Sequence, residues 1–160
     1  MSGWGNFFMA QVGASAALAG LIFVGVSINL AEILAAPLLP DYALEALVVL
    51  LTVLLVSTLS LVPGQPPAIF GGEILVVGFA GWALMSARRR HNLRQVKPPY
   101  RRSFAANAVL EQVATLPFVG AGAAVLFRGD GGLYWVIPGV VFSFLVAFYN
   151  AWVLLIEIKR

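Results

Sequence analysis

A row of polar side chains lies in one of the apolar stretches of the chain. Its four members recur every four residues: Ser103, Asn107, Glu111 and Thr115. This spacing places them along one face of a helix, with Gln112 beside them. Such a row, with one ionisable group, suits a path for an ion or a proton. The alternative is structural, with Glu111 paired to an arginine at the start of the helix, such as Arg101 or Arg102.

A second carboxylate, Glu73, lies a few residues inside another apolar stretch. It follows Gly71 and Gly72, beside which a backbone or a ligand can come close. A charged carboxylate at that depth is costly unless it is paired, hydrated or protonated. Three side chains are candidate partners: Asn6, Gln11 and Arg128. Two interpretations stay open: a site in an outward-facing vestibule, or an interfacial glutamate that reaches the lipid headgroups.

Other apolar stretches carry their own polar or small faces. Ser143 and Asn150 lie seven residues apart near the C-terminus, and we include both in the candidate polar path. Near the N-terminus, small residues lie on the face opposite Gln11 and Ser15: Gly13, Ala16 and Gly20. Small residues let helix backbones approach closely in a membrane. We therefore expect this face to pack against another helix.

The residue types argue against most enzyme chemistry. There is no cysteine, and the single histidine, His91, lies among arginines. Zinc-type sites need several His or Cys ligands, and a hydrolase triad needs a base beside a serine. We therefore predict no enzyme activity, no metal and no cofactor. The basic residues flank apolar runs instead of covering a face, so we predict no nucleic-acid partner.

Composition points to a membrane. The 160 residues are 61% hydrophobic and 11% charged, whereas soluble domains average about 45–50% and about 25%. A chain that cannot build a charged shell must expose apolar surface to lipid. We predict an all-α integral membrane bundle, one transmembrane domain over residues 1–160, with five spans: 7–29, 43–62, 69–87, 107–127 and 133–156. Glu73 and Glu111 interrupt two of these, and a count of four follows if either span lies flat on the interface.

Charge asymmetry predicts the orientation. Seven of the ten basic residues lie in the segment 88–102: Arg88, Arg89, Arg90, Arg94, Lys97, Arg101 and Arg102. Short segments rich in Lys and Arg stay in the cytoplasm, and they attract anionic lipid headgroups. Two more basic residues close the chain, so we expect the C-terminus inside and the N-terminus outside. Residues 1–31 carry no charge, which favours a retained first span over a cleavable signal peptide.

Two blocks of sequence resemble a group of small bacterial inner-membrane proteins. The first is WGNFF (Trp4–Phe8) followed by GASAALAGLIFVGVSINL (Gly13–Leu30), and the second is LVPGQPP (Leu61–Pro67). Together they cover roughly the first two spans. That group has no assigned activity. The resemblance therefore implies a bacterial cytoplasmic membrane and transfers no catalytic or binding residue.

Two functional hypotheses follow. In the first, the protein is a subunit of a homo-oligomeric ion channel or transporter, because a bundle this small leaves little room for a pore unless copies repeat around an axis. In the second, it is an accessory or structural subunit of a larger membrane complex, and its small-residue faces dock on foreign helices. The expected partners are membrane lipids together with copies of the chain or another membrane protein.

Overall fold

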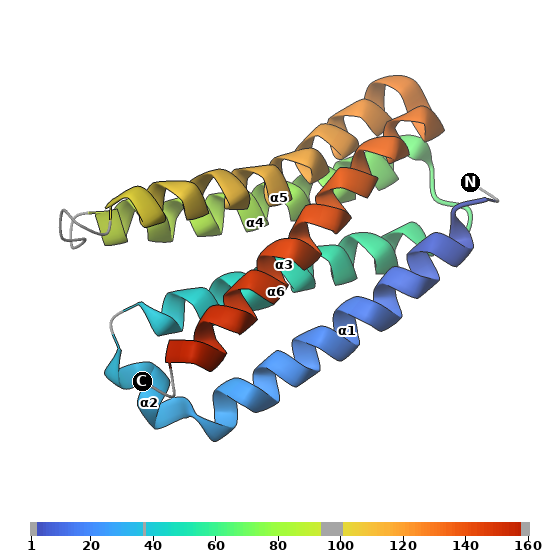
Figure 1. Cartoon of the computed structure of the whole chain (residues 1–160). Coiled ribbons are helices and arrows are strands. Elements are labelled where there is room, and N and C mark those ends of the chain that lie inside the picture. Colours follow the sequence, from blue (N-terminus) through green and yellow to red (C-terminus); the bar gives the residue numbers. More distant parts are fainter. Residues whose placement is uncertain (1–2, 37, 94–100, 158–160) are drawn as a thin grey trace. The chain divides into compact units, whose positions relative to one another are not determined.

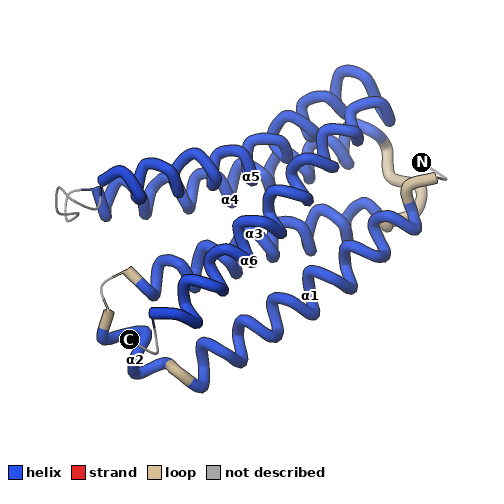
Figure 2. The backbone as a smooth tube through the Cα atoms, in the orientation of Figure 1, coloured by secondary structure: helices blue, strands red, loops and turns tan. Residues whose placement is uncertain are grey.

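The computed structural model describes residues 3–36, 38–93 and 101–157, except for the side chains of residues 91–93, 101–107 and 130. Within this part there is no strand, and helices joined by short turns make up nearly all of it (Figures 1 and 2). Five helices are long and apolar enough to cross a membrane. These are α1 (Gly5–Ile28), α3 (Leu39–Ser60), α4 (Pro67–Leu93), α5 (Arg101–Arg128) and α6 (Val136–Glu157). The predicted all-α fold with five spans is confirmed.

The helices continue into the basic segment that the sequence assigned to a loop. Helix α4 runs on to Leu93, and α5 already begins at Arg101. The hydrophobic pattern ends earlier than the helix because arginine is a good helix former. A helix of 27 residues is about 40 Å long and extends beyond a hydrocarbon core of about 30 Å. Arg94 and Lys97 lie outside the described residues.

The first span ends in a break and a short second helix that the sequence did not predict. Asn29 separates α1 from α2 (Leu30–Ala35). Its side-chain Nδ2 donates to the Gly25 carbonyl oxygen at 2.9 Å, and its backbone N–H donates to the same oxygen at 3.3 Å. The side-chain amide of Asn29 therefore competes with the backbone N–H for one carbonyl oxygen, which weakens the regular hydrogen bonds of the helix at this point.

The two hairpin connections differ from each other. After α3, Gly64 takes a positive φ of 72°, and Pro67 then begins α4. After α5, Gly129 has a φ of 62°, and the chain forms the 3-10 helix η2 (Gly129–Trp135). The sequence predicted only a tight turn here, so α6 begins later than expected.

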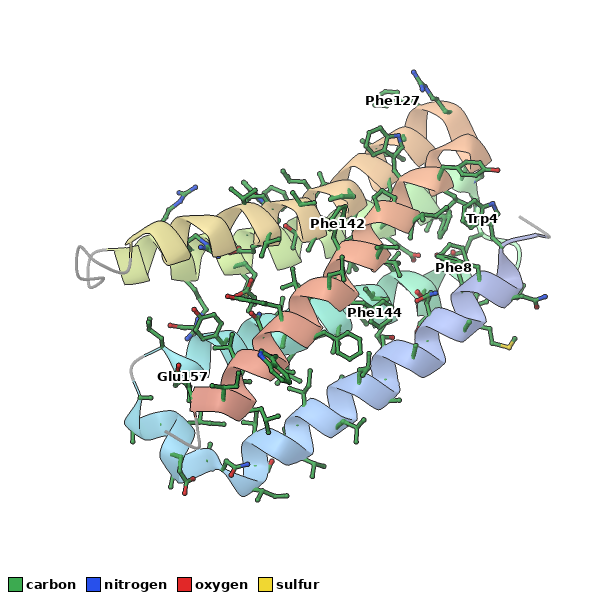
Figure 3. The ribbon with its side chains drawn as sticks, viewed as in Figure 1. Trp4, Phe8, Phe127, Phe142, Phe144 and Glu157 are labelled. Atoms are coloured by element: carbon green, nitrogen blue, oxygen red, sulfur yellow. The ribbon has the colours of Figure 1, made fainter. Side chains whose placement is uncertain are left out.

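The chain forms two compact units, which are described separately below. Unit 1 comprises Met1–Pro63 with Ser143–Arg160, and unit 2 comprises Gly64–Phe142. In unit 1, α1 packs along α3 (Figure 1). Aromatic rings close the first turn of α1, where Trp4 and Phe8 lie side by side with ring centroids 5.9 Å apart (Figure 3). Five apolar side chains of α3 are fully buried: Ala46, Val49, Leu50, Val53 and Val56.

Unit 2 is built on a close helix hairpin. Helices α4 and α5 run side by side (Figure 1), and glycines allow their backbones to touch. A Cβ atom added at Gly122 of α5 would lie 2.6 Å from the Cα of Leu75 in α4. One added at Gly78 of α4 would lie 2.9 Å from the backbone N of Val119 in α5. Real Cβ contacts essentially never fall below 3.0 Å, so only glycine permits this approach.

Candidate functional site

Glu111 is held in a buried ion pair between the two helices of unit 2. Its side chain is 2% exposed, and that of Arg89 on α4 is 14% exposed. The Arg89 Nε donates to Glu111 Oε2 at 2.6 Å, and Nη2 pairs with the same oxygen. The other oxygen, Oε1, has no hydrogen-bond partner among the described residues. The pair compensates the charge of a carboxylate that is otherwise costly inside a membrane.

This pairing changes one expectation from the sequence, the role given to Arg89. The candidate partners for Glu111 were Arg101 and Arg102, whose side chains lie outside the described residues. The partner in the structure is Arg89, which the sequence assigned to the lipid headgroups. The physical reason is register, because the antiparallel hairpin brings the end of α4 beside the start of α5. Arg88 and Arg90 are exposed, so the headgroup prediction for them stays open.

The polar row on α5 is partly satisfied within its own hairpin. The Thr115 hydroxyl, 1% exposed, donates to the Glu111 carbonyl oxygen at 2.8 Å. Gln112 Oε1 accepts a hydrogen bond from the indole Nε1 of Trp82 on α4 at 2.6 Å. Asn107 lies on the same helix, but its side chain is outside the described residues. The predicted row therefore lies against α4 at Glu111 and Gln112, and it carries bonds that hold the hairpin.

Glu73 has a partner that the sequence analysis did not consider. Its Oε2 accepts a hydrogen bond from Nε2 of Gln65, in the turn before α4, at 2.8 Å. Beside it, Gly71 fits closely against Leu126, whereas a Cβ at Gly72 would meet nothing within 4 Å. The glycine pair therefore contributes one close helix contact. Glu73 itself is half-buried and fixes the turn to the first turns of α4.

We expect the Gln65–Glu73 bond to stabilise the turn modestly. In a double-mutant cycle with Glu73→Ala and Gln65→Ala, the coupling in the free energy of unfolding should be about 1 kcal/mol. The measurement is denaturant unfolding of the purified protein in detergent micelles. A coupling indistinguishable from zero would show that the bond does not hold the turn.

The two carboxylates proposed for an ion path lie far apart along unit 2. Arg89, the partner of Glu111, follows Glu73 by sixteen residues on α4. At 1.5 Å per residue, this places Glu73 and the ion pair about 24 Å apart along the helix. They therefore cannot act together on one ion, and each has its own neutral or cationic partner.

Several polar residues of unit 1 are buried. Ser143 and Asn150 of α6 are each 1% exposed, as the shared face predicts. Other buried polar residues of this unit are Ser15, Glu45, Thr52 and Ser57. Three buried side-chain atoms of unit 1 have no hydrogen-bond partner among the described residues: Gln11 Oε1, Ser57 Oγ and Asn150 Nδ2. Buried polar atoms of this kind are sites where an internal water is expected.

The small-residue face of α1 is open. Gly13, Ala16 and Gly20 are all exposed, and a Cβ at either glycine would meet nothing within 4 Å. The opposite face of α1 carries the buried Phe8 and Ser15. The predicted helix contact is therefore not made within the described residues of unit 1.

Comparison with protein families, with curated proteins and with solved structures found no match to this chain. Among the described residues, no group of three or more His, Asp or Glu side chains is placed to hold a metal ion.

Proposed function

We propose that the protein is a non-catalytic assembly subunit of a membrane complex and docks through the small-residue face of α1. The observation that carries this proposal is the openness of Gly13 and Gly20, on the side of α1 away from its buried residues. Of the five spans, α1 has the smallest share of buried residues. In a membrane, close backbone packing replaces the hydrophobic effect as the main force between helices.

The state of the carboxylates supports an assembly role over conduction. A residue that carries ions along a pore has to exchange its partners. Glu111 is bonded twice to Arg89, and Glu73 is bonded to Gln65. Both carboxylates therefore have structural partners in unit 2.

Replacing Gly20 by leucine should abolish assembly. The Leu side chain would stand on the docking face and hold a partner backbone away. The measurement is the size of the complex extracted from native membranes, by native gel electrophoresis. Wild type should migrate above the size of one chain, and Gly20→Leu as one chain.

Gly25→Leu on the same helix is the matched control. A Cβ at Gly25 also meets nothing within 4 Å, but five residues of helix rotate it by about 140° from Gly20. It should therefore leave the complex intact. A Gly20→Leu protein that assembles like wild type would rule out docking through this face.

A homo-oligomeric channel is the second candidate. The unpartnered buried atoms Gln11 Oε1, Ser57 Oγ and Asn150 Nδ2 favour it, because water bound to them would make part of unit 1 polar inside. In proteoliposomes, this candidate predicts ion flux that Asn150→Leu lowers. The assembly role predicts no flux from either protein.

The membrane and orientation belong to the same proposal. The resemblance of Trp4–Phe8 and Gly13–Leu30 to small bacterial inner-membrane proteins supports a bacterial cytoplasmic membrane. The basic residues of 88–102 and the C-terminus support a cytoplasmic location for both segments. Five spans then place the N-terminus outside.

A further inference from the structure

The hydroxyl of Ser57 differs from the other hydroxyls of α3. Thr52, Thr58 and Ser60 each donate to the carbonyl oxygen four residues earlier, at 2.9, 2.8 and 2.7 Å. Such a bond satisfies a hydroxyl inside an apolar helix without any other group. Ser57 is 0% exposed, yet its Oγ has no hydrogen-bond partner among the described residues. A buried hydroxyl in this state is costly unless another group bonds to it.

A second buried group without a partner belongs to α1. Gln11 lies between the two buried residues of this helix, Phe8 and Ser15. It follows the first by three positions and precedes the second by four, so all three share one face of the helix. Its Oε1 is buried and has no hydrogen-bond partner among the described residues. On the same face, the Ser15 hydroxyl donates to the Gln11 backbone carbonyl oxygen at 2.6 Å, and its oxygen can still accept a bond.

Helices α1 and α3 run antiparallel, and an apolar contact gives their register (Figure 1). Val26 of α1 packs against a cluster that contains Leu39 and Ala43 of α3. From Val26 back to Gln11 is fifteen residues, about 22 Å of helix, and from Ala43 on to Ser57 is fourteen, about 21 Å. Ser57 follows Leu39 by eighteen residues, which is five full turns, so both lie on the same face of α3. The two groups without partners therefore lie at the same level of the α1–α3 pair, to within about one helical turn.

The chemistry of these groups selects a small neutral ligand. An amide oxygen only accepts hydrogen bonds, whereas a hydroxyl donates or accepts them. The two groups do not bond to each other, so the missing group has to donate to Gln11 Oε1 and also bond to Ser57 Oγ. Helix α1 has no charged residue, and the nearest one to Ser57 on α3 is Glu45, twelve residues away, or about 18 Å of helix. On these two helices a cation would find no carboxylate to balance it.

We propose that Gln11 and Ser57 hold one internal water molecule between α1 and α3. The water donates one hydrogen bond to Gln11 Oε1, accepts one from the Ser57 hydroxyl, and has a second proton for the Ser15 oxygen. Buried waters make about three such bonds to polar groups that otherwise lack partners. Inside a membrane no lipid tail can supply these bonds. The site is on the side of α1 that faces α3, so it depends neither on the proposed docking through Gly20 nor on ion flux.

The proposal is tested by two measurements on the full chain in detergent micelles. The first is magnetisation transfer from water to the side-chain amide of Gln11, by nuclear magnetic resonance. Wild type should show this transfer, because the internal water lies in contact with the amide group. Ser57→Ala removes one of the groups that hold the water and should lose most of the transfer. Thr58→Ala is the matched control, because its hydroxyl is exposed and bonded to its own helix, and it should keep the wild-type transfer.

The second measurement is a double-mutant cycle in the unfolding equilibrium constant with Gln11→Leu and Ser57→Ala. A shared water couples the two positions, so the double variant should depart from the product of the single effects by about fivefold. Gln11→Leu and Thr58→Ala should act independently. Coupling without transfer from water would show that the two side chains bond directly, which overturns the water. An absence of coupling between Gln11 and Ser57 overturns the site. Gly20→Leu should leave both measurements unchanged, so a failure of the docking proposal is distinguishable from a failure of this one.

Discussion

Gly122→Leu should lower the free energy of unfolding by about 3 kcal/mol or more, because overpacking here meets backbone and not a flexible side chain. A Cβ at this position would already lie 2.6 Å from the Cα of Leu75. To accept the larger side chain, α4 and α5 have to separate along the crossing. The measurement is helix loss under denaturant titration in detergent micelles, followed by circular dichroism.

The control for this prediction compares two alanine variants, Gly122→Ala at the close crossing and Gly120→Ala away from it. Gly120 is on the same helix, and a Cβ there would come no closer than 4.0 Å to the Trp135 ring. The free energy of unfolding of Gly120→Ala should equal that of wild type or exceed it by up to about 1 kcal/mol, because alanine has the higher helix propensity. Equal stability of the two alanine variants would contradict the close α4–α5 crossing.

Arg89→Leu should cost about 3–5 kcal/mol of unfolding free energy, because it leaves the Glu111 carboxylate buried without its cation. Glu111→Gln should cost less. It removes the buried negative charge, and the long Arg89 side chain can reach the membrane boundary with its guanidinium in water. The same unfolding titration measures both variants, and the expected result is this asymmetry.

The double variant Arg89→Leu with Glu111→Leu tests the reason for the asymmetry. Replacing both members of a buried pair by apolar residues is often neutral or stabilising. The double variant should therefore recover most of the stability that Arg89→Leu loses. If it is less stable than Arg89→Leu alone, the ion pair does not account for the loss.

Much of the architecture could be predicted from the sequence because hydrophobic length is a strong signal. A spanning helix needs about 20 apolar residues, and the five predicted spans match α1, α3, α4, α5 and α6 within a few residues at most ends. The inward face of α6 was also predictable, since Ser143 and Asn150 recur seven residues apart and both are buried.

Tertiary partners could not be predicted in the same way. The Arg89–Glu111 pair depends on the register of two antiparallel helices, which no spacing within one helix encodes. The close approach at Gly78 and Gly122 depends on the same register. A glycine in the sequence does not by itself mark such a contact, because a Cβ at many glycines of the chain would meet nothing within 4 Å. The break at Asn29 is a competition between one amide and the helix for the Gly25 carbonyl, which a hydrophobicity pattern does not register.

The helices of the two units have different roles. In unit 2, glycines and the Arg89–Glu111 ion pair hold α4 against α5, and Glu73 holds the preceding turn to α4. In unit 1, α1 presents its small residues on the side away from its buried residues. Under the proposed function, the chain would act through this face of α1.

Native mass spectrometry of the protein released directly from its own membranes tests the central claim most directly. A single chain has a mass of 17.1 kDa. The assembly role predicts a larger species that contains this chain, from which Gly20→Leu is missing. A mass that is an integral multiple of one chain would identify a homo-oligomer, and any other mass a foreign partner. A wild-type protein found only as a single chain would contradict the account.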